Sequence, residues 1–481
     1  MNNELFDCLI IGAGVSGAAI ARYLAKYQLK IAVLEKHNDV GEETTNANSA
    51  IVHSGYDPKP LSKKAYFNVL GNKMMPKLCE ELDVPFKKIG SLTVGFDDED
   101  LKTLNDLLLR AQTNKVKARI IEQKELFKIE PNINKLATCA LFCEDAGIIS
   151  PFNLVVNLME NAMDNGVKLF LNWEVKNIIK DNGLYIVTNK EGDTFKAKTV
   201  VNASGVFADD INALLEKSDF KIIPRKGQYI VLDHFDSNFV KHVLFSLPTK
   251  VGKGVLVAPT TSNNYIIGPS NEESLKDDTS TTVEVLNYVK ETATKLVENI
   301  PFQESIRQFS GVRANVDRDD FVIEESTSNE GYFKVCGIMS PGLASAPAIG
   351  EYVANLVSTN LKAKENPQFN PSIRKGLNLT TLGIDKYNEL IKSDLRYGNM
   401  ICRCEKISEG EIVDAISRNC GPTTVKGVKK RLRPGFGKCQ GTFCQDEVIK
   451  ILARELKIPL NEVNYSELHT EILKYKVKNH E

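Results

Sequence analysis

Apolar and polar positions along the first 35 residues predict a strand, a turn, a helix and a second strand. The apolar run 5–11 is typical of a strand that is buried on both faces. Residues 15–27 carry small and apolar side chains at helical spacing, and a second apolar run, 29–34, ends at Glu35. The pattern therefore indicates a strand–turn–helix–strand unit at the start of the chain.

Glycines at defined positions in this turn predict a dinucleotide site. Gly12 permits a tight turn, Gly14 lets the backbone approach a pyrophosphate, and Gly17 lets the helix pack closely on the strand. The helix N-terminus presents N–H groups to phosphate, and an acid about 20 residues further on, here Glu35, holds a ribose hydroxyl. The alternative is a glycine-rich turn that binds no nucleotide. The residues assigned to the cofactor here are Gly12, Gly14, Val15, Ser16, Gly17, Glu35 and Lys36.

Further along the chain, the pattern predicts helices and strands in mixed order. Helices are expected over 61–82, 99–114, 151–165 and 282–300, and a loop at 337–342 leads into a helix that ends near 357. Strands are expected over 91–96, 167–172 and 198–202, together with a hairpin that joins 185–187 to 194–197. Prolines and asparagines over 363–378 break the pattern and predict a linker.

Length and composition limit the class of protein. The 481 residues suggest about three domains, and 42% hydrophobic with 26% charged residues is typical of a globular protein. A net charge of −1 does not favour a nucleic-acid partner, and no apolar run is long enough to predict a transmembrane segment. The first residues include Glu4 and Asp7 where a signal peptide would be basic, so we expect a cytoplasmic location, with any membrane attachment through a partner.

Four of the ten cysteines are spaced as two close pairs, Cys402 with Cys404 and Cys439 with Cys444. In a reducing compartment such pairs favour a metal site over disulfides, although this spacing is unusual for zinc. Zinc, or no metal, are the alternatives. Cys420 lies outside the spacing and is not expected to be a ligand. Cations surround the second pair, where they would stabilise a negative cluster or form a solvated helix face or a nucleic-acid patch: Lys426, Lys429, Lys430, Arg431, Arg433 and Lys438.

With these pieces in view, the chain resembles the flavoprotein family of D-amino-acid oxidase type, which includes glycerol-3-phosphate dehydrogenases and 2-hydroxyglutarate oxidases. The matching stretches are residues 7–14, 200–205, 311–313 and 340–350. The resemblance implies FAD in place of NAD as the cofactor. The further residues that it implies along the FAD are Ser49, Ala203, Ser204, Gly205, Gly342 and Leu343.

The C-terminal segment resembles the small [2Fe–2S] domain first known from bacterioferritin-associated ferredoxin, on the basis of residues 402–405 and 433–444. The resemblance implies a [2Fe–2S] cluster on Cys402, Cys404, Cys439 and Cys444. The expected fold class is α/β (α+β overall), with a discontinuous Rossmann-type FAD domain, an inserted β-sheet substrate domain and a small C-terminal iron–sulfur domain. The expected boundaries are 1–82, 144–217 and 311–362 for the FAD domain, 83–143 and 218–310 for the substrate domain, 363–398 for the linker, 399–455 for the [2Fe–2S] domain and 456–481 for a tail.

A flavin that oxidises a small anionic substrate needs a cation for the anion and a group for the proton. Arg313 matches the arginine that anchors the substrate in the family, and its alternative role is structural. Arg318 and Lys253 are further candidates, or else solvated surface charges. His53 is a candidate base or polarising group, or alternatively a hydrogen-bonded neighbour of the cofactor.

The expected activity is the oxidation of sn-glycerol 3-phosphate to dihydroxyacetone phosphate by hydride transfer to FAD. The electrons would then leave singly through the cluster to a partner subunit, such as a second flavoprotein. The alternatives are the oxidation of L-2-hydroxyglutarate or another 2-hydroxy acid, the oxidation of an amine or imino acid, and an electron-relay subunit without a substrate of its own.

Overall fold

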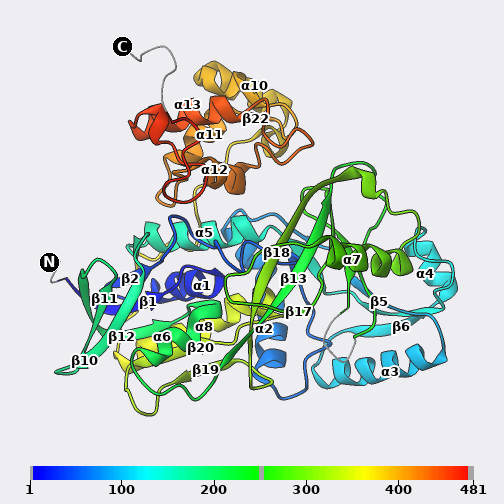
Figure 1. Ribbon diagram of the computed structural model, residues 1–481, viewed down its shortest axis with the longest axis horizontal. Coiled ribbons are helices and arrows are strands. Elements are labelled where there is room, and N and C mark those ends of the chain that lie inside the picture. The colour runs from blue at the N-terminus through cyan, green and yellow to red at the C-terminus, as the bar shows by residue number, and fades with distance from the viewer. Residues whose placement is uncertain (1–3, 249–253, 475–481) are drawn as a thin grey trace.

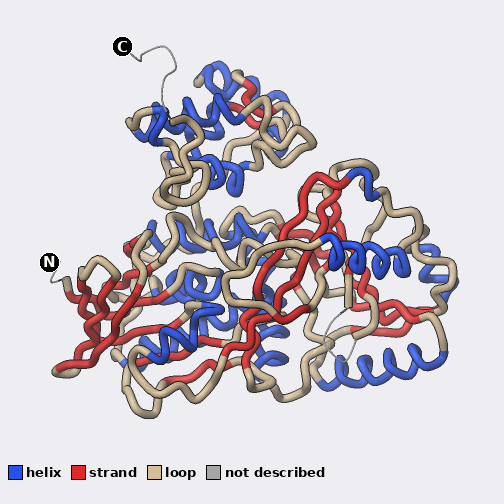
Figure 2. Tube along the Cα trace, in the orientation of Figure 1, coloured by secondary structure: helices blue, strands red, loops and turns tan. Residues whose placement is uncertain are grey.

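Two large sheets lie side by side beneath a small, mainly helical unit in the computed structural model, which describes residues 4–248 and 254–474 (Figure 1). The small unit is formed by the C-terminal part of the chain, drawn in orange and red. Figure 2 shows that the strands gather in the two lower parts, whereas the C-terminal unit consists mostly of helix and loop. The mixed α/β class and the three-part organisation agree with the expected fold.

The first sheet has eight strands, and its core is parallel. The order is β10–β11–β12–β1–β2–β9, with β20 also paired to β12 and β19 paired to β20. Phe6, Leu9 and Ile10 of β1 are fully buried. Helices cover the face of the sheet that carries Ile10, and side chains of the three-stranded meander β10–β11–β12 pack on the face that carries Phe6 and Leu9. The strands are β1 (Leu5–Ile11), β2 (Ile31–Leu34), β9 (Lys168–Phe170), β10 (Val175–Asp181), β11 (Leu184–Asn189), β12 (Thr194–Asn202), β19 (Val322–Glu325) and β20 (Tyr332–Cys336).

Helices from distant parts of the chain cover this sheet. α1 (Val15–Leu24) packs against both α8 (Gly342–Asn360) and α5 (Pro151–Asp164), and α2 (Lys63–Glu81) packs against α8. Gly350 allows the close approach of α8, because a Cβ there would lie 2.8 Å from the backbone of Ala19. The short helices η1 (Gly205–Phe207) and α6 (Ala208–Ala213) follow β12. The nucleotide-binding unit is therefore assembled from separated segments.

The second sheet has nine strands in the order β17–β13–β16–β15–β14–β5–β7–β6, with β18 on the other edge of β13. It is mostly antiparallel, and helices cover one side. Its elements are β5 (Ser91–Gly95), α3 (Asp98–Thr113), β6 (Ala118–Glu122), α4 (Gln123–Ile129), β7 (Cys139–Cys143), β13 (Ile222–Leu232), β14 (Val243–Phe245), β15 (Leu256–Pro259), β16 (Tyr265–Gly268), β17 (Glu272–Glu273), α7 (Val283–Leu296), η2 (Phe302–Glu304) and β18 (Ser305–Val316). A small sheet consists of β3 (Ile51–Val52), β8 (Gly147–Ile149) and β4 (Phe86–Lys88). It packs against the core of the first sheet through Val52 and Ile149 and against the second sheet through Ile51 and Ile148.

The C-terminal unit begins earlier than the sequence pattern suggests. Residues expected to be linker form α9 (Leu379–Leu382), α10 (Ile384–Ser393) and η3 (Leu395–Gly398). Tyr387 of α10 is buried, and its hydroxyl donates to the Tyr397 carbonyl oxygen at 3.1 Å, so these turns belong to the unit. The remaining elements are β21 (Met400–Cys402), β22 (Ile407–Ser408), α11 (Glu409–Ile416), α12 (Val425–Leu432), α13 (Gln445–Leu456) and η4 (Leu460–Glu462).

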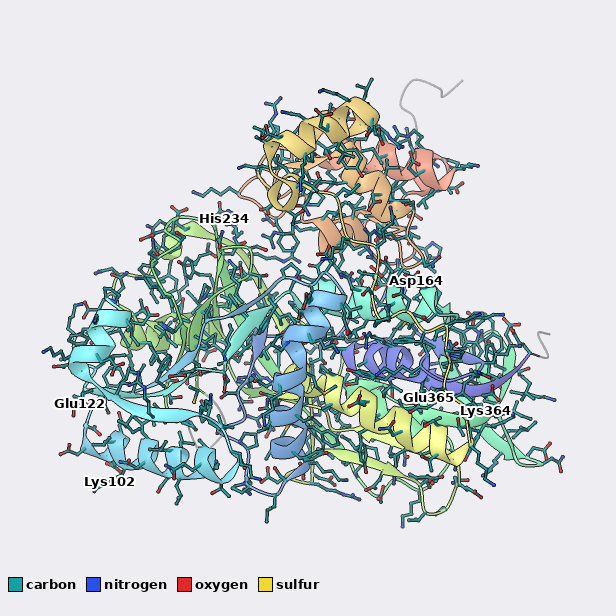
Figure 3. All side chains as sticks on the ribbon, turned by 180° about the vertical axis from the view of Figure 1, so that it is seen from behind. Lys102, Glu122, Asp164, His234, Lys364 and Glu365 are labelled. Atoms are coloured by element: carbon teal, nitrogen blue, oxygen red, sulfur yellow. The ribbon has the colours of Figure 1, made fainter. Side chains whose placement is uncertain are left out.

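The stretch 363–378 runs along the FAD-binding part instead of hanging free. Arg22 donates to the Pro371 carbonyl oxygen at 3.1 Å, and Asn161 donates to the Asn370 carbonyl oxygen at 3.0 Å. Lys364 and Glu365, labelled in Figure 3, pair with the turn after α1, where Gln28 N–H donates to the Lys364 carbonyl oxygen at 2.8 Å. Across the ranges 4–248 and 254–474, no helix has both the length and the apolar composition that crossing a bilayer requires.

Candidate active site and iron–sulfur site

The glycine turn after β1 has the shape that a pyrophosphate needs. Gly12 has φ +102°, and a Cβ there would lie 2.6 Å from the Ala203 carbonyl oxygen. A Cβ on Gly17 would lie 1.9 Å from the Gly12 carbonyl oxygen, so only glycine lets α1 start so close to the strand. Thr45 supports the helix start by accepting the Val15 N–H at 3.0 Å. Sequence reasoning missed Thr45, because its contact to the turn spans 30 residues.

Glu35 lies at the end of β2, against the same turn. Its Oε2 accepts the Ala13 N–H at 2.7 Å, and its Oε1 accepts the His37 N–H at 3.0 Å. Burial raises the pKa of Glu35, and these two donors oppose that shift. Glu35, Lys36, Gly12, Ser204 and Gly205 line one cavity of about 380 Å³. The acid and the glycine turn thus face the same space.

A second cavity continues from the first. The two share Gly14, Thr44, Thr45, Ala203 and Gly205 in their walls. The second cavity runs to the N-terminus of α8, where the amide groups of the first helical turn have no partners within the helix. The sequence-predicted residues that line it are Gly14, Val15, Ser16, Ser49, His53, Ala203, Gly205, Arg313, Gly342 and Leu343. The two cavities form one elongated space that fits a dinucleotide with a flavin at the α8 end.

Arg313 lies in the wall of the second cavity, on β18. Its Nη2 donates to the Ser270 carbonyl oxygen at 3.0 Å, and its Nη1 donates to Asn271 Oδ1 at 3.3 Å. Gly227 on the neighbouring strand β13 makes room for the guanidinium, since a Cβ there would lie 2.2 Å from Nη2. The guanidinium is thus held by neutral oxygens, which leaves its charge available to an anion.

His53 follows β3 and lines the same cavity. Its ring stacks on Phe245 with centroids 5.7 Å apart, and its carbonyl oxygen accepts from Asn68 Nδ2 at 2.7 Å. Residues 44–50, which precede β3 and are called the cofactor loop here, also contribute to the wall of this cavity. The hydroxyl of Ser49 in this loop lies 3.2 Å from the hydroxyl of Tyr229 on β13. Tyr229 was not predicted, because an isolated tyrosine in a strand carries no sequence signal for a site.

Two predicted residues do not line either cavity, and a third is not among the described residues. Arg318 points away from the cavity and pairs with Asp219 at 2.7 Å, with its side chain 42% exposed. Lys253 lies outside the described residues. Gly17 does not line either cavity and acts through the packing of α1 on the turn.

The four predicted metal-ligating cysteines come together in the C-terminal unit. Cys402 ends β21, Cys404 follows it, Cys439 lies in the loop after α12, and Cys444 precedes α13. The Sγ atoms of Cys404 and Cys439 are 3.9 Å apart. A hydrogen bond from Cys444 lowers the pKa of the Cys402 thiol to about 6, so these two thiols form the other pair.

In the described part of the chain, the thiols gather as two pairs, with no group of three or more metal-ligating side chains already at metal-binding distances. A [2Fe–2S] cluster takes four thiolates, so two adjacent pairs provide the right donor set. A Cβ on Gly437 would lie 2.7 Å from the Cβ of Cys404, so the loop that carries Cys439 packs tightly against Cys404. The residues present therefore fit the cluster.

The cations of this region are not a solvated helix face. Lys430, Arg431 and Lys426 pair with acids of the FAD-binding part, and Lys438 pairs with Glu304 of the second sheet at 2.6 Å. Arg433 pairs at 2.8 Å with Glu405, which directly follows Cys404 in the sequence. Lys429 is buried, which lowers its pKa to about 8.

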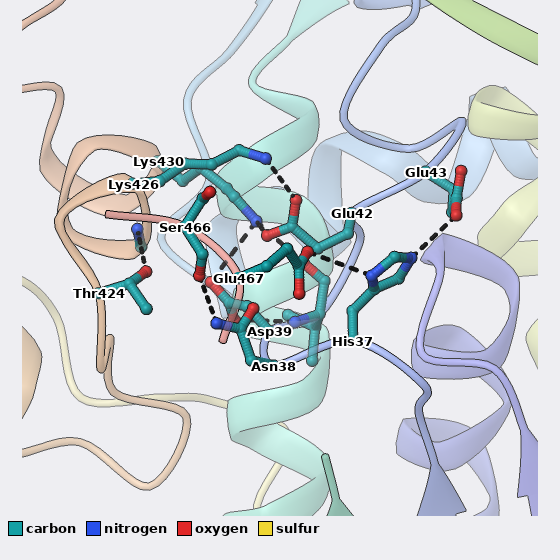
Figure 4. Close-up of polar contacts among 12 residues, drawn as sticks. His37, Asn38, Asp39, Glu42, Glu43, Thr424, Lys426, Lys430, Ser466 and Glu467 are labelled. Atoms are coloured by element: carbon teal, nitrogen blue, oxygen red, sulfur yellow. Dashed lines mark hydrogen bonds and ion pairs between the residues drawn. The ribbon is translucent and has the colours of Figure 1, made fainter. Parts of the chain in front are cut away.

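Residues in the segment just after Glu35 contact the C-terminal unit, among them His37, Asn38, Asp39 and Glu42 (Figure 4). His37 lies between Glu43, at 2.8 Å, and Glu467, at 3.1 Å, and Asn38 donates to the Ser466 carbonyl oxygen. The view from behind shows the C-terminal unit above the parts of the chain that carry Asp164 and His234 (Figure 3). The segment that borders the cofactor cavity is thus also a docking surface for the cluster unit.

Comparison with known families agrees with this architecture. Residues 7–356 match the family described as FAD dependent oxidoreductase, and residues 400–454 match the BFD-like [2Fe-2S] binding domain. The resemblances noted in the sequence are thereby confirmed.

Individual relatives extend the match. The chain is 48% identical to a glycerol 3-phosphate dehydrogenase of Caloramator mitchellensis, over 95% of this chain and 96% of the relative. It is 34% identical to a glycerol 3-phosphate oxidase of Mycoplasma genitalium, over 77% of this chain and 99% of the relative. The solved structure of an L-alpha-glycerophosphate oxidase from Mycoplasma pneumoniae, reduced by dithionite and with FAD bound, superposes with a TM-score of 0.73 at 30% identity, over 77% of this chain and 98% of that chain. The chain therefore belongs to the FAD-dependent oxidoreductase family and carries a C-terminal [2Fe–2S] domain, so its cofactors are FAD and a [2Fe–2S] cluster.

Proposed function

We propose that this protein oxidises glycerol 3-phosphate to dihydroxyacetone phosphate at the flavin end of the cavity. The observation that carries the proposal is Arg313, whose guanidinium lies in the cavity wall and is bound only by neutral oxygens among the described residues. A phosphate group is the natural partner of such a guanidinium. The relatives named as glycerol 3-phosphate dehydrogenase and oxidase support this choice of substrate.

The reaction removes two electrons and two protons from the secondary alcohol. FAD bound in the cavity would supply the acceptor for the hydride of the carbon that bears the hydroxyl. Arg313 binds the phosphate and thereby fixes the distance of this carbon from the cofactor. His53, in the wall of the same cavity and stacked on Phe245, is the group we assign to hold the hydroxyl proton.

We further propose that the electrons leave through the cluster to a partner protein. A [2Fe–2S] cluster accepts one electron at a time, so it suits transfer to another protein. The relative named as a dehydrogenase matches 95% of this chain, whereas the relative named as an oxidase matches 77% and lacks a counterpart to the remainder. A cluster unit docked on the segment that borders the cofactor cavity also supports this route.

Anaerobic mixing of the holoprotein with single substrates tests the proposal. Glycerol 3-phosphate should bleach the flavin absorbance at about 450 nm, whereas L-2-hydroxyglutarate and L-proline should leave it unchanged. L-2-hydroxyglutarate is the second candidate, because L-2-hydroxyglutarate dehydrogenases also match the chain, at 24–30% identity. Bleaching by L-2-hydroxyglutarate alone would transfer the assignment to a 2-hydroxy acid, and bleaching by none would refute the dehydrogenase proposal.

A further inference from the structure

A cavity of about 410 Å³ lies where the C-terminal unit meets the other two parts of the molecule. Its wall includes Lys429 and Arg433 from the C-terminal unit, Arg307 and Ser310 from β18, and Ala47 and Asn48 from the cofactor loop. Ala47 and Asn48 also line the flavin end of the cofactor cavity, so the two spaces share a wall. This interdomain cavity therefore lies between the flavin site and the cluster unit.

Positive charge in this cavity exceeds negative charge. Its two acids are already neutralised, since Glu42 pairs with Lys426 and Lys430, and Glu43 pairs with Lys36 and His37. Lys429 is 8% exposed and Arg307 is exposed at the cavity edge, and neither has a carboxylate partner among the residues that the structure describes. Two cations without counter-ions therefore face one space.

The electrostatics of Lys429 point in the same direction. Apart from burial, the largest influence that lowers its pKa is the charge of Arg307, and Arg433 adds to it. Its Nζ lies 4.8 Å from the centroid of the Phe436 ring. Burying an ammonium group close to another cation is unfavourable unless an anion joins them.

The second cation of the cavity comes from the edge strand β18. Side chains alternate along a strand, so Arg307 projects from the same face of β18 as Arg313. Arg433 reaches across the junction to Asn264 Oδ1 at 2.8 Å. Two cations without carboxylate partners around one cavity are the components of an anion site.

The charge of the cluster explains only part of this arrangement. The negative charge of Cys439 and Cys444 raises the pKa of Lys429, so a bound cluster would attract its ammonium group. Arg307 belongs to the other side of the cavity, on the strand that carries Arg313, and the cluster ligands do not account for it. A second anion accounts for both cations.

We propose that the interdomain cavity binds the phosphate group of a small molecule between Lys429 and Arg307, separately from the substrate phosphate at Arg313. The site would join the cluster unit to the second sheet through one ligand. Because its wall includes Ala47 and Asn48, a ligand there would also contact the loop that faces the flavin. The proposal does not depend on the identity of the substrate.

Isothermal titration of the holoprotein with inorganic phosphate, in a buffer without phosphate, tests this site. Arg313→Ala removes the anchor in the active site and serves as the background. On this background, phosphate should still bind, and Lys429→Met or Arg307→Gln should each weaken binding by roughly tenfold or more, because each removes a charge-assisted contact. Lys438→Ala is the matched control, since Lys438 belongs to the same loop as the cluster ligands but pairs with Glu304 outside the cavity wall, and it should leave phosphate binding unchanged.

Flavin and iron contents of each variant show whether it has folded with both cofactors. Arg307→Gln is decisive if Lys429→Met fails this check, because Arg307 is exposed. Loss of all phosphate binding in Arg313→Ala alone would overturn the proposal. A second result would also overturn it: Arg307→Gln leaves phosphate binding unchanged, and Lys429→Met changes only the reduction potential of the cluster. Lys429 would then serve the cluster alone.

Discussion

Arg431 and Asp39 form a two-pronged ion pair between the cluster unit and the cofactor-binding part, with Nη1–Oδ2 at 2.8 Å and Nη2–Oδ1 at 2.9 Å. Both side chains are buried, and Arg431 also donates to the Cys420 carbonyl oxygen at 2.8 Å. Burial would raise the pKa of Asp39, but the Arg431 guanidinium outweighs this effect and holds that pKa well below its usual range. Asp39 is only four residues beyond Glu35, so docking of the cluster unit and the shape of the cofactor site share one short segment.

Removing this pair should loosen the cluster unit. Asp39→Asn leaves a buried guanidinium without its counter-ion, which destabilises a folded state by about 3–5 kcal/mol. We expect an earlier unfolding transition in urea and faster proteolysis between residues 363 and 378, where the chain enters the unit. Glu447→Ala is the control, because it removes a surface ion pair on α13, and it should leave both measurements nearly unchanged. Equal behaviour of the two variants would contradict the role of the pair.

The contact between His37 and the last part of the chain should weaken at high pH. Burial would lower the pKa of His37, but hydrogen bonds with Glu43 and Glu467 raise it from its usual 6.5 to about 9. A raised pKa means that the contribution to stability is complete below about pH 6.5 and is lost as the pH rises through about 9. The loss should be on the order of 2–3 kcal/mol.

Urea unfolding at a series of pH values measures this effect. The difference in stability between the wild type and His37→Gln should be large at pH 6 and small at pH 10, where neither side chain is charged. A difference that does not change over this range would show that the imidazolium does not stabilise the contact.

Two glycines of the turn should respond differently to the same substitution. A Cβ on Gly17 would overlap the Gly12 carbonyl oxygen at 1.9 Å, so Gly17→Ala should destabilise the apoprotein itself. A Cβ on Gly14 would meet only Thr45 Oγ1 at 3.5 Å, so Gly14→Ala should fold normally but bind FAD at least about tenfold more weakly. Thermal unfolding of the apoproteins and titration with FAD separate the two effects, and normal FAD binding by both variants would exclude this turn as the pyrophosphate site.

Substrate anchoring can be separated from cofactor binding with two arginines of similar position in the sequence. Arg313→Ala should weaken binding of glycerol 3-phosphate by roughly 10- to 100-fold, because it removes charge-assisted hydrogen bonds, while FAD content stays normal. Arg318→Ala is the control, since Arg318 pairs with Asp219 away from the cavity. Loss of FAD together with substrate binding in Arg313→Ala would mean that Arg313 is structural.

Local features of the site were predictable from the sequence. The glycine turn and the acid that follows β2 depend on backbone geometry within one βαβ unit, and the structure places Gly12, Gly14 and Glu35 around one cavity. The long helices α2, α3, α5 and α7 were predicted within a few residues of their ends, because their apolar spacing is regular. The four cysteine ligands were predictable because each close pair in the sequence is a local pattern, although in space Cys404 lies beside Cys439 and Cys402 lies beside Cys444.

Relationships between distant segments were not predictable. Arg431 and Asp39 are 392 residues apart, and no periodicity relates a basic helix to the acids that neutralise it. The space for the Arg313 guanidinium depends on Gly227, which belongs to a different strand. The helices within 379–393 were missed because α10 is short and mostly exposed, with Tyr387 as its one fully buried side chain among those described.

The central claim is that electrons from one small anion pass through the flavin to the cluster of the same chain. Anaerobic addition of glycerol 3-phosphate to holoprotein, followed by both absorbance and electron paramagnetic resonance, tests it most directly. The account predicts that flavin absorbance falls and that the signal of a reduced [2Fe–2S] cluster appears in the same sample, while Cys439→Ser gives the absorbance change without the signal. Flavin that stays oxidised, or a cluster that stays oxidised after the flavin is bleached, would contradict the account.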